Sequence, residues 1–208
     1  MKSAFSLIEM VAVVAVLAIL LTAGVSLMRG TGAQARLAGT DMLAGMIEQA
    51  RTSAITTRSY VILAVAEPGD LPAGDERCRL GLFKVETWPD STSEAVEAVL
   101  MTRWRTLENG IALIGGDNDG VPNPLNGPQL TLSYGAPKAL RVNVHCLVFN
   151  SRGGLHLPAG SVPVAFRIAE GSYRDGKATP YLSGGGTAVI ENRLKIGRVI
   201  ARPYRIDG

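Results

Sequence analysis

The stretch from Phe5 to Met28 constrains the fold of this chain more than any other. It is almost wholly apolar, and nineteen residues from Met10 to Met28 pass without a charged side chain before Arg29. A helix of about 20 apolar residues matches the roughly 30 Å hydrocarbon core of a bilayer, because each residue adds about 1.5 Å. The stretch therefore predicts a transmembrane helix over residues 5–28, with Lys2 on the cytoplasmic side.

Glu9 is the one charged residue inside this stretch. No basic residue lies three or four positions from it. An acidic side chain at the centre of a membrane helix costs about 2.5–3.5 kcal/mol, and less near the interface. A carboxylate at this depth therefore indicates a function and a partner, for which we predict a free α-amino group on a neighbouring copy of the same helix.

The segment Phe5-Ser-Leu-Ile-Glu9, after a short polar leader with a lysine, resembles the amino terminus of type IV pilins and type II secretion pseudopilins. The resemblance implies cleavage between Ala4 and Phe5 by a prepilin peptidase, N-methylation of Phe5, and a role for Glu9 in assembly. The residue before the cut is usually glycine, and here it is Ala4. The implied partners are other pseudopilins or pilins in a filament, the prepilin peptidase and inner-membrane lipid. The implied location is the bacterial inner membrane, with a single pass, a cytoplasmic amino terminus and a periplasmic carboxy-terminal domain.

Two other interpretations compete for the same stretch. A secretory signal peptide would use Ala33-Gln-Ala35 as its cleavage site, but it leaves Glu9 unexplained and its apolar region would be too long. A plain signal anchor would place the Glu9 carboxylate in the membrane at a cost in free energy, without a function that explains it. The pilin-like interpretation is favoured over both.

Helix-breaking residues divide the remainder of the chain. No proline precedes Pro68, whereas glycine and proline are frequent after it. Leu43, Ile47, Ala50 and Ala54 follow helical spacing, so we expect helix from about Phe5 to about Thr57. The predicted organisation is a leader over residues 1–4, a transmembrane half-helix over 5–28, a periplasmic half-helix over 29–57 and a periplasmic β domain over 58–208.

Short runs rich in β-forming residues fill the β domain, separated by turn signals and by a long loop over 115–127. They predict strands over 60–65, 79–86, 99–107, 111–114, 140–149, 162–169, 188–190 and 194–201. The predicted fold class is α+β, with the long helix packed on antiparallel β-sheets in a sandwich-like, pilin-like domain. Four segments are similar in order to the H-type minor pseudopilins and FimT-like proteins: Ala50-Arg-Thr-Ser-Ala-Ile55, Trp104-Arg-Thr-Leu-Glu-Asn-Gly-Ile111, Val148-Phe-Asn-Ser-Arg-Gly153 and Ile196-Gly-Arg-Val199.

The carboxy-terminal segment is basic, although the net charge of the whole chain is only +3. Arg198, Arg202 and Arg205 are candidates for contact with nucleic acid or a partner. FimT-like proteins of DNA uptake machines carry a Gly-Arg-x-Arg segment at this end, but Ile200 stands where the second arginine would be. Even spacing would put Arg198 and Arg202 on one face if both lay on one strand. A solvated terminal strand is favoured, because few arginines give weak, salt-sensitive binding.

Other chemistry finds little support in the sequence, which predicts neither an enzyme nor a cofactor. His145 and His156 form no metal-binding pair at helical spacing. The run Asp117-Asn118-Asp119 offers oxygen ligands for calcium, but it lacks the glutamate of an EF-hand and also suits an ordinary turn. Cys78 and Cys146 permit one disulfide in an oxidising compartment, and their spacing does not show that they meet.

Overall fold

The structure is a computed structural model that describes residues 7–71, 76–89, 95–116, 119–135, 137–182 and 188–206. The chain divides into two compact units, residues 1–34 and residues 35–208. Helix α1 (Leu7–Thr57) provides the described part of the first unit and continues into the second. All strands belong to the second unit.

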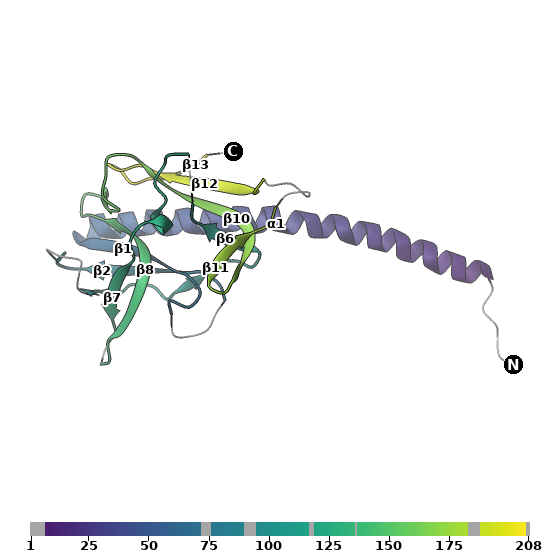
Figure 1. The fold of residues 1–208 in the computed structure, drawn as a ribbon, viewed down its shortest axis with the longest axis horizontal. Helices are drawn as coiled ribbons and strands as arrows, with labels where there is room; N and C mark the ends of the chain where they lie inside the picture. Colours follow the sequence, from purple (N-terminus) through teal and green to yellow (C-terminus); the bar gives the residue numbers. More distant parts are fainter. Residues whose placement is uncertain are drawn as a thin grey trace. The chain divides into compact units, whose positions relative to one another are not determined.

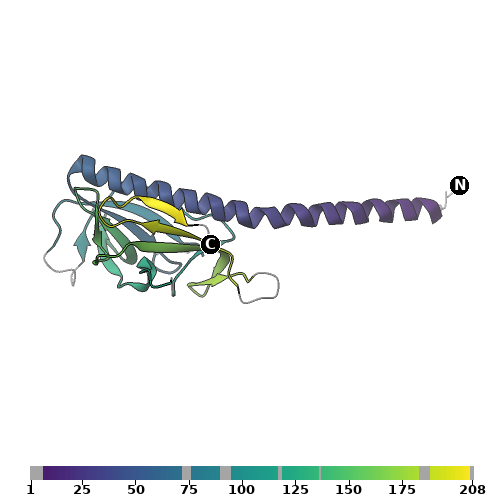
Figure 2. The same cartoon turned by 90° about the horizontal axis from the view of Figure 1, so that it is seen from above.

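Helix α1 is continuous over 51 residues, and its range agrees with the predicted helix over residues 5–57. Leu43, Ile47 and Ala50 are fully buried at helical spacing, so this part of α1 presents one apolar face to the strands (Figure 2). The helix ends in a Schellman motif at Arg58, which has a left-handed φ of 50°. The Arg58 N–H donates to the Ile55 carbonyl and the Ser59 N–H to the Ala54 carbonyl.

The first sheet has eight strands. Figure 1 labels four of them, β1, β2, β7 and β8. Its strands follow the order β3-β7-β8-β1-β2-β4, with β5 added to β2 and β9 added to β8. All pairs are antiparallel except β3 with β7, which is parallel. The strands are β1 (Tyr60–Ala66), β2 (Arg79–Val85), β3 (Val96–Glu97), β4 (Val99–Leu100), β5 (Arg105–Thr106), β7 (Leu130–Tyr134), β8 (Leu140–Phe149) and β9 (Leu155–Leu157).

This sheet nearly closes on itself. Strands β3 and β4 stand at opposite ends of the strand order, yet only Ala98 separates them in the chain. The Ala98 N–H donates to the Ser133 carbonyl of β7 at 3.0 Å, and the Met101 N–H donates to the Leu82 carbonyl of β2 at 2.8 Å. One short segment therefore passes from β7 to β2 and brings the two ends of the curved sheet together.

The second sheet follows the order β11-β10-β12-β13, with β6 also paired to β10, and every pair is antiparallel. Its strands are β6 (Ile111–Ile114), β10 (Val164–Arg174), β11 (Lys177–Pro180), β12 (Glu191–Ile196) and β13 (Pro203–Ile206). A short 3₁₀ helix, η1 (Pro124–Asn126), precedes β7. Asn123 caps η1 by accepting a hydrogen bond from the Leu125 N–H.

Alternation along β1 separates two cores. Val61, Leu63 and Val65 join a cluster shared by α1 and strands of both sheets, including Phe149 and Phe166. Their neighbours in β1, Ile62, Ala64 and Ala66, face a second cluster enclosed by the curved first sheet. Both faces of β1 are thus buried, which explains its unbroken apolar sequence.

These observations correct the predicted fold class. We expected a sandwich-like, pilin-like domain of antiparallel sheets, but the first sheet curves to near closure and contains a parallel pair. The predicted strand over 99–107 is interrupted: β4 and β5 pair separately with β2. The predicted closing strands are also displaced, because residue 189 forms only an isolated bridge and the run over 194–201 ends at Ile196.

Within the part of the chain that the structure describes, no helix is both long and apolar enough to cross a membrane. The predicted location, a single pass through the bacterial inner membrane with a periplasmic carboxy-terminal domain, depended on such a helix and is corrected by this finding.

Candidate functional site

The first part of α1 carries the residues that the sequence singled out for processing and assembly. Ala4 and Phe5 lie outside the described residues, and Glu9 lies within α1. The six large apolar side chains of the next two turns are 51–64% exposed: Met10, Val11, Val13, Val14, Val16 and Leu17. They point in all directions around the helix, because residues 10–18 are all exposed. This segment, residues 10–18, is called the apolar segment below.

A polar cluster fixes α1 to the second sheet inside the second unit. The Arg36 guanidinium donates to a Glu170 carboxylate oxygen at 2.7 Å and to the Asn192 side-chain oxygen at 3.1 Å. The Asn192 amide donates in turn to the Thr40 hydroxyl at 3.1 Å, which donates to the Arg36 carbonyl at 2.7 Å. Both partners of the Arg36–Glu170 ion pair are mostly buried. Such a closed set of bonds is geometrically selective and sets the position of α1 along the sheet.

The basic carboxy-terminal segment does not present its arginines on one strand. Arg198 follows β12 and Arg202 precedes β13, so the predicted shared face does not form. The Arg198 guanidinium donates to the backbone carbonyls of Pro158 and Val162, and burial lowers the pKa of Arg198. Arg205 pairs with Asp41 of α1 at 2.8 Å. Only Arg202 of the three candidates is exposed without a described partner.

Of the three candidate calcium ligands, the structure describes only Asp119, because Asp117 and Asn118 lie outside the described residues. The Asp119 carboxylate pairs with Arg193, which lowers the pKa of Asp119. Arg193 also donates to Glu191, which pairs with Arg167 on the neighbouring strand. Asp119 thus belongs to an ion-pair network on the second sheet, and its charge is already compensated.

The two cysteines lie in different cores as free thiols. Cys78 belongs to the cluster between α1 and the sheets, whereas Cys146 packs against the cluster inside the curved sheet. Burial raises the pKa of each thiol to about 12. The fold places the two side chains in different cores, so the disulfide that the sequence permits is not present in this structure.

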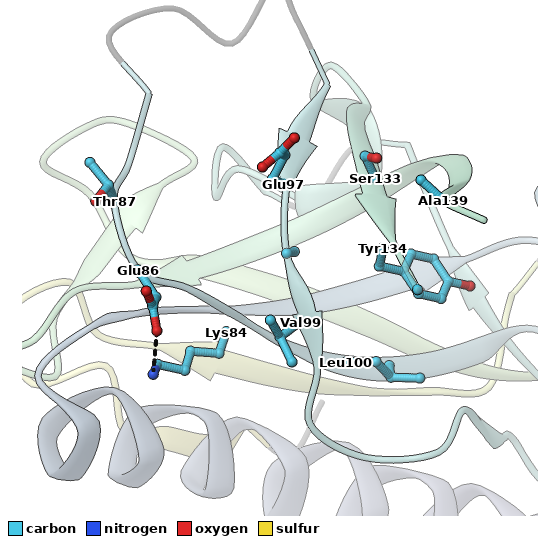
Figure 3. Close-up of a pocket in the computed structure, with 11 residues that line it drawn as sticks. Lys84, Glu86, Thr87, Glu97, Val99, Leu100, Ser133, Tyr134 and Ala139 are labelled. Atoms are coloured by element: carbon cyan, nitrogen blue, oxygen red, sulfur yellow. Dashed lines mark hydrogen bonds and ion pairs between the residues drawn. The ribbon is translucent and has the colours of Figure 1, made fainter. Parts of the chain in front are cut away.

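A hollow of about 880 Å³ opens where the segment between β3 and β4 changes partners (Figure 3). Val99 is 65% exposed and provides apolar surface together with Leu100 and Tyr134. Glu86 pairs with Lys84 at 3.2 Å, whereas Glu97 is exposed without an ion-pair partner among the described residues. These residues define what is called the hollow below. It combines an apolar floor with one uncompensated carboxylate.

Known proteins give no further guidance to these sites. No family model, curated protein or solved structure matches this chain.

Sequence reasoning missed the hollow, since its residues come from β2, β4, β7 and their loops, which only the near closure of the first sheet brings together. It also missed the cluster of Tyr60, Trp88 and His156, whose ring centroids lie 5.1–5.4 Å apart. His145 is half-buried, and burial lowers its pKa.

Proposed function

We propose that this chain is a minor pseudopilin, a structural subunit of a type II secretion or type IV pilus-like filament that a prepilin peptidase processes. The observation that carries the proposal is the apolar segment of α1. Its exposed side chains cover a whole helical circumference, whereas a helix of an isolated domain would expose a polar face. Burying such surface contributes about 25 cal/mol per Å², so the segment favours association.

The occupants of this surface are the corresponding helices of neighbouring subunits. In a bundle, an apolar helix can be surrounded by other apolar helices on all sides. Such packing would remove every exposed side chain of the segment from water. Glu9 then lies among apolar side chains, where it pairs with the α-amino group of Phe5 on the next subunit. That pair would fix the register of the helices, since burying a carboxylate alone is costly.

The second unit contributes mechanical strength to this role. Its cores are complete without the apolar segment, so the domain is suited to remain folded while the segment packs elsewhere. The cluster of Arg36, Thr40, Glu170 and Asn192 resists sliding of α1 along the second sheet. The nucleic-acid alternative is not proposed further, because Arg198 and Arg205 are already engaged within the domain.

The decisive experiment replaces Glu9 with leucine in the full chain. We expect Glu9→Leu to be cleaved before Phe5 and to fold, yet to be lost from the filament. Removing one partner of a buried ion pair costs about 3–5 kcal/mol, which corresponds to a loss of at least a hundredfold in association. Co-purification with the other filament subunits measures incorporation, and Val13→Leu is the matched control that leaves the charge in place. Undiminished incorporation of Glu9→Leu would contradict the role of the carboxylate in registering subunits.

Mass spectrometry of the mature chain tests processing separately. The expected product begins at Phe5 and carries one additional methyl group on its amino terminus. A mature chain that begins at Arg36 would contradict the proposal, because that start fits a secretory signal peptide cleaved after Ala35.

A further inference from the structure

A second exposed apolar surface lies on the loops before β10 and after β12. Val199 is 85% exposed, and Ile200 and Val162 are 58% and 50% exposed. The Arg198 guanidinium ties the two loops together by donating to the carbonyls of Val162 and Pro158. These three aliphatic residues, called the loop patch below, are thus held in place by hydrogen bonds of a partly buried arginine.

Arginines border the loop patch. The Leu155 N–H donates to the Arg198 carbonyl at 2.9 Å, which places the turn containing Arg152 beside the patch. The Gly197 N–H donates to the Arg202 carbonyl at 3.3 Å on the other side. Arg152 and Arg202 are both exposed and have no ion-pair partner among the described residues. The patch is therefore aliphatic at its centre and positively charged at its rim.

The hollow has the opposite properties on another part of the same domain. Its floor is apolar, with Val99 and Leu100, and its uncompensated charge is the carboxylate of Glu97. At about 880 Å³ the hollow has room for several aliphatic side chains. Aliphatic side chains with a basic rim would find there both an apolar surface and a complementary charge.

We propose that the loop patch of one copy of this chain docks in the hollow of a second copy. The loop patch and the hollow are different surfaces, so the contact is heterologous and adds copies in a row. The inference goes beyond the proposed function, because it involves only residues 35–208 and does not depend on the apolar segment. A protein partner is favoured over nucleic acid because the patch is aliphatic and offers no aromatic face on which a base could stack.

Photo-crosslinking of the full chain tests this contact directly. A photoreactive phenylalanine derivative replaces Val199, and the crosslinked peptides are identified by mass spectrometry. We expect crosslinks between position 199 of one copy and residues 84–87 or 97–100 of another, segments that line the hollow. The same probe at Leu182, which is 57% exposed on a different loop, is the matched control and should not label the hollow.

Charge reversal then tests the complementarity. Arg202→Glu in the probe-bearing chain, or Glu97→Arg in its partner, should each lower the crosslink yield by about tenfold, because like charges then meet. Combining Arg202→Glu with Glu97→Arg in the two partners should restore the yield. Such restoration cannot arise from misfolding of either variant.

Three results would overturn the inference: crosslinks from position 199 that map away from the hollow, yields that ignore residue 97, or no restoration in the combined pair. A labelled DNA duplex provides the competing outcome. Salt-dependent binding of the duplex that is lost on Arg152→Glu plus Arg202→Glu, without crosslinks to the hollow, would assign the loop patch to nucleic acid instead. All of these results leave the Glu9 experiment unaffected, so the two proposals fail separately.

Discussion

Replacing Gly81 with alanine tests the near closure of the first sheet where Trp104 packs on β2. Gly81 lies in β2, and Trp104 packs over it while also contacting Phe83. The Trp104 indole N–H donates to the Tyr134 hydroxyl at 3.2 Å, so the ring is also attached to β7. The stability of a Gly81 variant therefore tests whether β2, the segment after β4 and β7 meet as the structure shows.

The expected cost follows from the space around Gly81. A methyl group there would lie 2.9 Å from Cε3 and 3.0 Å from Cζ3 of Trp104, and 3.1 Å from Cε2 of Phe83. The Trp104 ring is restrained by its hydrogen bond to Tyr134 and its contact with Phe83, and overpacking of this kind costs about 1–3 kcal/mol. Leaving glycine for alanine in a strand returns about 0.5–1 kcal/mol. We expect a net loss in the free energy of unfolding of up to about 2.5 kcal/mol, the difference between these two terms.

Equilibrium urea unfolding followed by tryptophan fluorescence measures this loss, because Trp88 and Trp104 are the only tryptophans of the chain. Gly45→Ala is the matched control: Gly45 is exposed within α1, and an added methyl group there meets no atom within 4 Å. That variant should gain about 0.5–1 kcal/mol. Equal midpoints for the two variants would refute the packing of Trp104 on β2.

Two further predictions concern buried titratable groups. Burial, and then the nearby Asp70 carboxylate, raises the pKa of Glu67 above its ordinary value of 4.5, so ionised Glu67 destabilises the fold as pH rises through this range. Glu67→Gln should therefore be more stable than the unmodified chain at pH 7 and should lose that advantage near pH 4. Urea unfolding at both pH values measures the difference. An advantage that does not depend on pH would contradict the burial of this carboxyl. The second prediction concerns Cys78 and Cys146, whose thiols each have a pKa of about 12. Both should resist a disulfide-exchange reagent at pH 8 in the folded chain, and both should react after unfolding in guanidinium without reductant. Recovery of no thiol would mean that the two cysteines are bonded.

The sequence predicted elements whose pattern is local. The spacing of Leu43, Ile47, Ala50 and Ala54 predicted the buried face of α1, and all four are fully buried. Helix α1 and the strands β1, β2, β6 and β8 are predicted within a few residues for the same reason, since each is a continuous run between turn residues. Strands such as β7, which opens after the long loop, were missed because their periodic signal is short.

Closure of the first sheet could not be predicted, because it depends on partners far apart in the chain. Residues 99–107 contain enough β-forming residues for one strand, and the prediction of a single strand was wrong. Met101 bonds to Leu82 and Arg105 pairs with Leu80, while Trp104 turns between them to cover Gly81. The interruption coincides with the packing of the partly buried Trp104 ring on Gly81 and Phe83, a tertiary contact that a local pattern does not reveal.

Among the candidate sites too, local sequence signals could be predicted, whereas contacts between distant residues could not. Glu9 was identified because a charge interrupts an apolar run, a signal that needs no partner in view. Arg198 was identified by composition, but in the fold its guanidinium donates to the carbonyls of Val162 and Pro158, so part of its hydrogen-bonding capacity is already used within the domain. The arginines that remain available near it, Arg152 and Arg202, come from different parts of the chain and share no motif. Binding surfaces assembled by tertiary contacts therefore depend on which charges the fold leaves without an ion-pair partner. Among the described residues, Arg152 and Arg202 beside the loop patch and Glu97 in the hollow are three such charges.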